Sequence, residues 1–129
     1  MKKQIEVVAA VIIKNNKVFV AQRGYGDYKG GWEFPGGKIE LGEEPQTALT
    51  REIKEELNVQ IQVKELIKTI EYDYPNFHLT MHCFKCLLNN QKIELLEHQG
   101  SCWLTKEEIN SINWLPADLE VLEEVKALI

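Results

Sequence analysis

The stretch from residue 36 to residue 59 constrains the fold of this chain more than any other. It opens with Gly36 and Gly37, passes Pro45, and closes with the run Arg51-Glu52-Ile53-Lys54-Glu55-Glu56-Leu57-Asn58-Val59. Glycine reaches backbone conformations that other residues avoid, and proline is favoured in the first turn of a helix. The stretch therefore predicts a glycine turn, a loop, and a helix over Pro45–Leu57 that ends at Asn58.

The predicted helix carries an apolar arc beside an acidic one. The apolar arc, at a spacing typical of a core-facing side, consists of Leu49, Ile53 and Leu57. The acidic arc has carboxylates three and four residues apart, at Glu52, Glu55 and Glu56. Carboxylates this close repel one another unless a cation lies between them, and hard ions such as Mg²⁺ favour oxygen ligands. The pattern indicates a magnesium site; the alternative is a solvated helix face with an ordinary i, i+4 pair between Arg51 and Glu55.

The stretch resembles the Nudix box, G-x5-E-x7-R-E-U-x-E-E-x-G-U, in which U is apolar. The matching positions are Gly37, Glu43, Arg51, Glu52, Ile53, Glu55, Glu56 and Val59. Asn58 stands where the family has glycine. Because asparagine also tolerates the left-handed conformation at a helix end, we expect this departure to cost a little stability and not function.

The resemblance implies a fold and a reaction. The fold is of the α+β class, an α/β/α sandwich with a curved mixed sheet between helices and the box as a loop–helix–loop. The reaction is Mg²⁺-dependent hydrolysis of a nucleoside diphosphate linked to a further group, with Mn²⁺ as a substitute ion. The implied metal ligands are Glu52, Glu55, Glu56 and the Gly37 carbonyl. Glu52 is also a candidate to orient or deprotonate water, Arg51 would anchor the carboxylates, and Glu43 would tie the loop to the helix.

Residues outside the box extend this resemblance. Glu97 lies where MutT-like members carry an additional metal-binding glutamate, although a solvated loop acid is the alternative. His98 beside it could act as a base, but a surface or hydrogen-bonding histidine is the more usual role. Arg23 would contact phosphate or base, and Asp118 would read the base unless it is simply a helix N-cap. Four aromatic residues could stack on a base or belong to the core: Phe34, Tyr74, Phe77 and Phe84.

The flanking segments narrow the subfamily by likeness. Four short segments look like those of MutT-type nucleoside triphosphate pyrophosphohydrolases, and still more like those of their CTP pyrophosphohydrolase branch. They are Ala21-Gln22-Arg23, Trp32-Glu33-Phe34, Glu97-His98-Gln99 and Leu115-Pro116-Ala117-Asp118. That likeness implies release of a nucleoside monophosphate and pyrophosphate, which would clear damaged or surplus nucleotides. A hydrolase of ADP-ribose or a similar substrate, or a non-catalytic nucleotide-binding module, stays open, as does the preferred base.

Composition limits the remaining classes. A chain of 129 residues with 44% hydrophobic and 27% charged residues predicts one domain over 1–129. The net charge of −5 argues against a nucleic acid polymer as partner but not against a small nucleotide held through a metal ion. The apolar run over residues 7–13 is too short to span a bilayer, so we expect a cytoplasmic protein without a membrane partner. No motif sets the oligomeric state, so monomer and homodimer are both open.

The rest of the chain mixes strand and helix patterns. We expect a hairpin of residues 5–13 and 17–22, one or two strands over 60–72, a turn at Pro75-Asn76, and strands over 78–88 and 102–104. A capping-box spacing predicts a short helix from Thr105. A single C-terminal helix after Pro116 would bury Leu119, Leu122, Val125 and Ile129. The three cysteines, Cys83, Cys86 and Cys102, indicate packing residues, because Cys83 and Cys86 would point to opposite faces of a strand and no second pair completes a zinc site.

Overall fold

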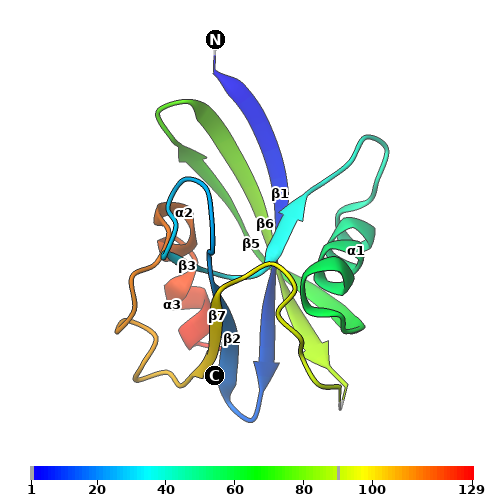
Figure 1. Ribbon diagram of the computed structural model, residues 1–129, viewed down its shortest axis with the longest axis vertical. Helices are drawn as coiled ribbons and strands as arrows, with labels where there is room; N and C mark the ends of the chain where they lie inside the picture. The colour runs from blue at the N-terminus through cyan, green and yellow to red at the C-terminus, as the bar shows by residue number, and fades with distance from the viewer. Residues whose placement is uncertain (1, 90) are drawn as a thin grey trace.

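The computed structural model describes residues 2–89 and 91–129, and this part of the chain forms a seven-stranded sheet flanked by helices. The strands are β1 (Lys3–Lys14), β2 (Lys17–Gln22), β3 (Trp32–Glu33), β4 (Gly36–Lys38), β5 (Ile61–Asp73), β6 (Phe77–Leu88) and β7 (Gly100–Leu104). The helices are α1 (Pro45–Leu57), α2 (Pro116–Leu119) and α3 (Leu122–Lys126). Helix α1 lies on one side of the sheet, and α2 and α3 lie on the other (Figure 1). The predicted α+β sandwich is confirmed. None of the helices in the described residues is long and apolar enough to cross a membrane.

Strand β1 is the centre of the sheet. It pairs in parallel with β6 along almost its whole length and antiparallel with β2 and β4, so the sheet is mixed as expected. Strand β2 in turn carries β3 and β7, and β5 lies beyond β6. The run Val8–Ile12 is buried throughout, because both faces of β1 are covered.

The two faces of the sheet hold two separate apolar cores. One core lies under α1 and includes Ile12 and Phe19 together with the predicted apolar arc, Leu49, Ile53 and Leu57, which is fully buried. The other core lies under α2 and α3. Cys83 belongs to the second core and Cys86 to the first, so their predicted placement on opposite faces of a strand is confirmed.

The ends of α1 and the first hairpin follow local sequence signals. Helix α1 has the predicted bounds, and Asn58 adopts the left-handed conformation (φ 54°, ψ 41°) while its amide donates to the Lys54 carbonyl. The β1–β2 turn is made by Asn15 and Asn16, with φ of 52° and 60°, a pair of positive values typical of tight hairpin turns. For residues 60–72 the sequence predicted either one or two strands. The structure has the single strand β5 there, with register shifts between Val63 and Lys68.

The predicted helix from Thr105 is wrong. The Thr105 amide and hydroxyl both donate to Glu108 Oε1 at 2.9 Å, as in a capping box, but residues 106–110 form only turns. The hydrogen bonds that follow span three residues and not four, and the Ile109 carbonyl accepts from the indole of Trp114 at 2.7 Å. The Ile109 carbonyl is therefore taken by the buried Trp114 indole and is not free to accept a backbone hydrogen bond within a longer helix.

The single C-terminal helix is also wrong, because the segment divides into α2 and α3. Leu119, which was expected in the core, is 52% exposed, whereas Val121 is fully buried. Contacts with residues just after β3 and β5 fix α2: Tyr74 Oη accepts from the Ala117 amide, and Asp118 Oδ2 accepts from the Phe34 amide. These contacts set the rotation of α2, and the break before α3 brings Val121 inward in place of Leu119.

Candidate active site

The glycine pair brings β4 unusually close to β1 and α1. Gly36 and Gly37 pair with Ala9 and Val8 of β1. A Cβ atom on Gly36 would overlap the Val8 carbonyl oxygen, and one on Gly37 would overlap the carboxylate of Glu52. Gly36 therefore needs to be glycine, because its neighbour is fixed backbone, whereas a side chain at position 37 would displace the Glu52 carboxylate. The result is a carboxylate from α1 held directly against the β4 backbone.

Arg51 joins the loop before α1 to the acidic arc of the helix. Its Nε and Nη2 donate to Oε2 and Oε1 of Glu43, both at 2.9 Å. Its Nη1 donates to Glu52 Oε1 at 2.9 Å and lies 3.3 Å from Glu55 Oε2, and its Nη2 also reaches the Lys38 carbonyl at 3.1 Å. The Arg51 hydrogen bonds lower the pKa of Glu43 to about 2. One guanidinium thus orients three carboxylates and the end of β4.

Glu56 is the buried member of the acidic arc. It is 6% exposed, and its Oε1 has no hydrogen-bond partner among the described residues. Burial, followed by the charges of Glu52, Glu33 and Glu97, raises the pKa of Glu56 to about 9. A carboxyl in this position holds its proton at neutral pH unless a cation compensates its charge.

The oxygen donors around Glu56 suit a hard cation. Among residues 2–89 and 91–129, no three His, Cys, Asp or Glu side chains stand close enough together to hold a metal ion as they are. The local chemistry nevertheless fits one: an unpaired buried oxygen on Glu56, a carboxylate on Glu52 against the Gly37 backbone, and the more exposed Glu55 on the same helix.

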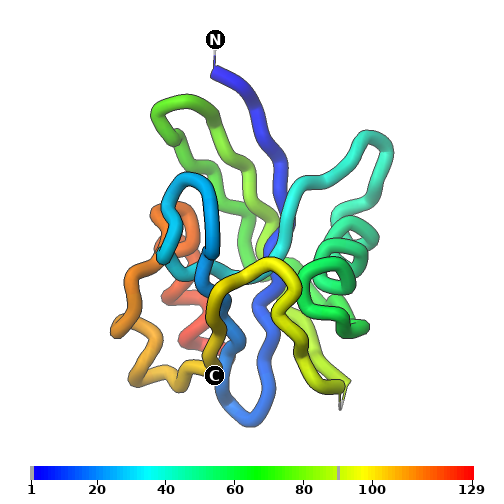
Figure 2. Tube along the Cα trace, viewed as in Figure 1, coloured from blue at the N-terminus to red at the C-terminus, as the bar shows by residue number. Residues whose placement is uncertain are grey.

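Glu97 approaches this arc from a distant segment. The Leu96 amide donates to the Glu56 carbonyl at 3.0 Å, and the Gln99 amide donates to the Gln22 carbonyl at 3.0 Å, which fixes both sides of Glu97. In Figure 2 the yellow segment after β6 runs back between α1 and β7. Glu97 and Glu56 consequently line the same cavity, of about 240 Å³.

Glu33 and His98 make a link that the sequence did not indicate. Glu33 Oε1 accepts from Arg23 Nη2 at 2.7 Å, and Glu33 Oε2 lies 3.1 Å from His98 Nε2. Burial opposes the ionisation of Glu33, but the hydrogen bonds from His98 and Arg23 outweigh it and hold its pKa below the ordinary value. The side chain of His98 is only 7% exposed, so its predicted hydrogen bonding is confirmed while a surface position is wrong.

An apolar cavity of about 370 Å³ adjoins the acidic one, and Arg23, Asp27, Glu33 and Gly36 line both. Three of the four candidate aromatics line it, Phe34, Tyr74 and Phe77, whereas Phe84 lies in the core under α1. Phe34 packs on Trp114 with ring centroids 4.8 Å apart. The cavity has the planar apolar walls that a nucleobase needs.

Asp118 is the buried polar group of this apolar cavity. It is 5% exposed, and its Oδ2 accepts from the Phe34 amide at 2.9 Å. Burial raises its pKa to about 8. The expected N-cap role is wrong, because Leu115 is the N-cap residue of α2 and Asp118 lies within the first turn. Its carboxyl instead binds the amide of Phe34, the residue just after β3, and lines the apolar cavity.

Comparison with known proteins agrees with this architecture. A family model described as the NUDIX domain matches residues 3–125. The chain belongs to the Nudix family and is a Nudix hydrolase.

Its relatives include nucleotide hydrolases. It is 44% identical over 103 residues to an 8-oxo-dGTP diphosphatase of Proteus vulgaris, covering 78% of this chain and 90% of that protein. It is 35% identical over 127 residues to the CTP pyrophosphohydrolase of Escherichia coli (strain K12), covering 98% and 94%. The solution structure of the E. coli ORF135 protein has a TM-score of 0.85 at 34% identity, covering 98% of this chain and 91% of that chain. The Nudix fold and the MutT-like likeness expected from the sequence are confirmed.

Proposed function

We propose that this protein hydrolyses nucleoside triphosphates to a nucleoside monophosphate and pyrophosphate with the help of a divalent cation. The observation that carries the proposal is the adjacency of the two cavities. The apolar one, with Phe34 and Asp118, suits a base, and the acidic one, with Glu56 and Glu97, suits metal-bound phosphates. Arg23 lines both, at the position where a substrate would pass from base to phosphate.

Five groups would hold the cation: the carboxylates of Glu52, Glu55, Glu56 and Glu97 and the Gly37 carbonyl. Mg²⁺, or Mn²⁺ in its place, supplies neutralisation of phosphate charge and a lowered pKa for a bound water. The buried and unpaired Oε1 of Glu56 supports this assignment, because a nearby positive charge would stabilise its ionised form.

The chain's own residues do the positioning. Glu52 lies between Arg51 and the Gly37 backbone, where it can orient or deprotonate a water at the phosphate. Arg51 holds that carboxylate, and Glu43 holds Arg51, so a small change at either would misplace Glu52. Phosphoryl chemistry depends strongly on such positioning.

Asp118 and Phe34 would select the base. With its pKa near 8, Asp118 is largely protonated at neutral pH and presents both a donor and an acceptor. Cytosine places an amino donor next to a ring acceptor, which complements this pair. The relatives named CTP pyrophosphohydrolase and 8-oxo-dGTP diphosphatase support CTP, dCTP or an oxidised deoxynucleotide as substrate. Such an enzyme would clear damaged or surplus nucleotides in the cytoplasm, as a monomer or a homodimer.

The test is a panel of normal and oxidised NTPs and dNTPs with Mg²⁺, in which pyrophosphate and monophosphate are both measured. We expect pyrophosphate and a nucleoside monophosphate in equal amounts from at least one triphosphate, and loss of turnover in Glu55→Gln and Glu56→Gln. Release of orthophosphate, or turnover of ADP-ribose in place of every triphosphate, would contradict the proposal.

A further inference from the structure

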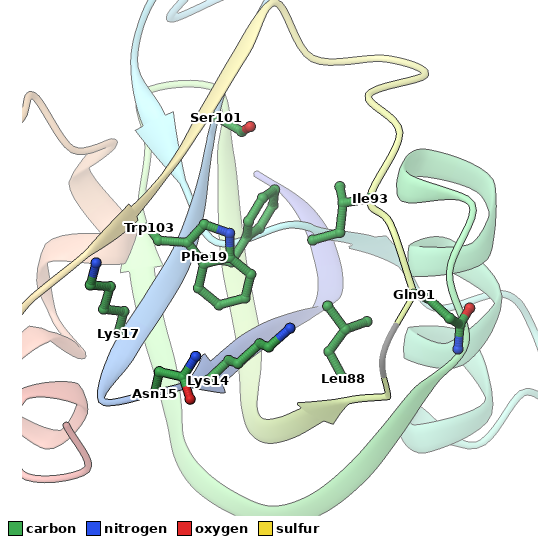
Figure 3. Close-up of a pocket in the computed structure, with 9 residues that line it drawn as sticks. All are labelled: Lys14, Asn15, Lys17, Phe19, Leu88, Gln91, Ile93, Ser101 and Trp103. Carbon is green, nitrogen blue, oxygen red and sulfur yellow. The ribbon is translucent and has the colours of Figure 1, made fainter.

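A third cavity lies away from the two cavities of the candidate active site. It has a volume of about 490 Å³ and is bounded by the end of β1, by β2 and β7, and by the residues just after β6 (Figure 3). In the described part of the chain, its lining residues differ from all those of the acidic and apolar cavities. It occupies the part of the α1 side of the sheet that α1 itself leaves uncovered, because α1 packs on β1, β4 and β5.

Two aromatic rings form one wall of this third cavity. Phe19 of β2 and Trp103 of β7 meet edge to face, with centroids 5.4 Å apart and an angle of 68°. Phe19 is fully buried, but Trp103 is only partly covered, so part of its indole borders the cavity. Leu88 and Ile93 face the rings across the hollow in Figure 3. The wall offers a planar apolar surface to a ring-shaped ligand.

The charge of the third cavity is positive on a protein of net charge −5. Lys14 and Lys17 line it, and neither forms an ion pair with an acid in residues 2–89 and 91–129. No carboxylate lies among its described lining residues. The hydrogen bonds from Thr105, and to a smaller extent the charge of Lys17, lower the pKa of Glu108, but Lys17 forms no ion pair with this carboxylate. Figure 3 shows Lys14 extending between the aromatic wall and Leu88, with Lys17 at the outer edge.

Neutral polar groups complete the lining. Ser101 of β7 contributes a hydroxyl and Asn15 an amide, whereas the amide of Gln91 is already hydrogen-bonded to the Gln60 backbone. Such groups can pair with the hydroxyls of a sugar or the edge of a base. A cavity of this size, with an apolar aromatic side and several polar side chains around it, can hold a small molecule that has both a ring and polar groups.

We propose that the third cavity is a second nucleotide site, which binds a nucleoside monophosphate with its base against Trp103 and its phosphate at Lys14. Lys17 adds to the positive field that attracts the phosphate. The choice of ligand rests on the proposed function, since hydrolysis of a triphosphate would release this product. The evidence for an aromatic anion at the third cavity, its ring wall and its two lysines, is independent of that function.

The experiment is an NMR titration of the ¹⁵N-labelled protein with CMP and with dGMP, in EDTA, alongside inorganic phosphate. We expect saturable shifts of the Trp103 indole N–H and of the Lys14 and Ser101 amides with at least one of the two nucleotides, and no shift of the Trp103 indole with phosphate. The double variant Lys14→Ala, Lys17→Ala should weaken binding about tenfold or more, because the charged contact of Lys14 to phosphate and the attraction from Lys17 are both lost. The matched variant Lys3→Ala, Lys64→Ala removes the same charge elsewhere and should bind as the parent does.

Three results would overturn the second site. They are an absence of saturable shifts at Trp103, equal weakening by both double variants, or identical shifts with phosphate alone, which would mean an anion and not a nucleotide. Pyrophosphate release is measured on the same variants, and Lys14→Ala, Lys17→Ala should leave it unchanged. If no triphosphate is turned over although CMP or dGMP binds at Trp103, the proposed function fails while the second site stands.

Discussion

Arg51 binds both carboxylate oxygens of Glu43, with Nε–Oε2 and Nη2–Oε1 distances of 2.9 Å each. This two-point contact fixes the loop over residues 39–44 against α1. The third nitrogen of the same guanidinium holds Glu52 at 2.9 Å. The position of Glu52 relative to the Gly37 backbone therefore depends on a residue that need not touch substrate.

The first prediction concerns Arg51→Lys. Lysine keeps the charge but cannot bind two carboxylate oxygens in a fixed plane while also reaching Glu52. We expect kcat to fall about 100-fold, because misplacement of a catalytic group by about 1 Å has costs of that size. Circular dichroism should show an unchanged fold. Lys54→Arg, a charge-conserving change on the same helix, is the control, and wild-type turnover by Arg51→Lys would contradict the positioning role.

The second prediction concerns the stability of the metal-free protein. The folded-state pKa of Glu56, about 9, lies above its ordinary value of 4.5. The folded protein therefore keeps a proton that the unfolded chain releases, and the free energy of unfolding should fall as pH rises from about 4.5 to about 9. In EDTA at pH 8, Glu56→Gln should be more stable than the parent by about 2 kcal/mol or more, because glutamine, unlike Glu56, need not take up a proton on folding at that pH.

Chemical denaturation at pH 5 and pH 8 measures this difference, with Glu55→Gln as the control on an exposed acid of the same helix. Mg²⁺ should stabilise the parent at pH 8 and leave Glu56→Gln almost unchanged. Equal pH dependence in Glu56→Gln and the parent would show that Glu56 does not carry the buried proton.

The third prediction concerns Asp118. Its folded-state pKa, about 8, also lies above its ordinary value of 3.8 because of burial, so Asp118 is largely protonated at neutral pH and loses its proton as pH rises through about 8. We expect kcat/KM for the preferred triphosphate to fall above pH 8, where Asp118 loses its donor. Asp118→Asn keeps a donor at every pH, so this part of the pH profile should disappear. A profile that is identical in the variant would exclude Asp118 from base recognition.

The fourth prediction concerns a histidine that lines neither cavity of the candidate site. His78 Nδ1 lies 2.8 Å from Asp73 and its Nε2 2.7 Å from Glu71, and these contacts, Asp73 first, raise its pKa above 6.5. Their contribution to stability is present in full below the unfolded pKa and is lost as pH rises through the raised folded pKa. An NMR titration should show a raised His78 pKa that Asp73→Asn lowers and Glu65→Gln does not. An ordinary pKa in the parent would refute the contact.

Helix α1 was predictable because every signal that defines it is local. Pro45 starts it, the spacing of Leu49, Ile53 and Leu57 sets its buried side, and Asn58 ends it. The C-terminal segment was not predictable in the same way. Its break and the exposure of Leu119 follow from contacts of Ala117 and Asp118 with Tyr74 and Phe34, more than forty residues earlier.

In the candidate site, too, the features set by local sequence were predictable and those set by distant contacts were not. The box acids could be named from their spacing alone. Helical periodicity also places Glu56, seven residues after Leu49, nearer the buried side than the exposed Glu55. The charges that face the Glu56 carboxyl from Glu33 and Glu97, however, come from distant segments. The Glu33–His98 contact joins residues 65 positions apart, so only the folded sheet brings them together. To predict this contact from the sequence, one would need to know that Trp32-Glu33 pairs with β2 and that backbone hydrogen bonds fix the segment around Glu97.

The central claim is that the acidic arc of α1 holds a hard cation and that this cation carries the substrate's phosphates. Calorimetric titration of Mg²⁺ into the protein with a non-hydrolysable CTP analogue tests it most directly. The account predicts saturable Mg²⁺ uptake that the nucleotide strengthens and that Glu56→Gln abolishes. Absence of Mg²⁺ uptake with the nucleotide bound, or uptake that Glu56→Gln leaves intact, would contradict it.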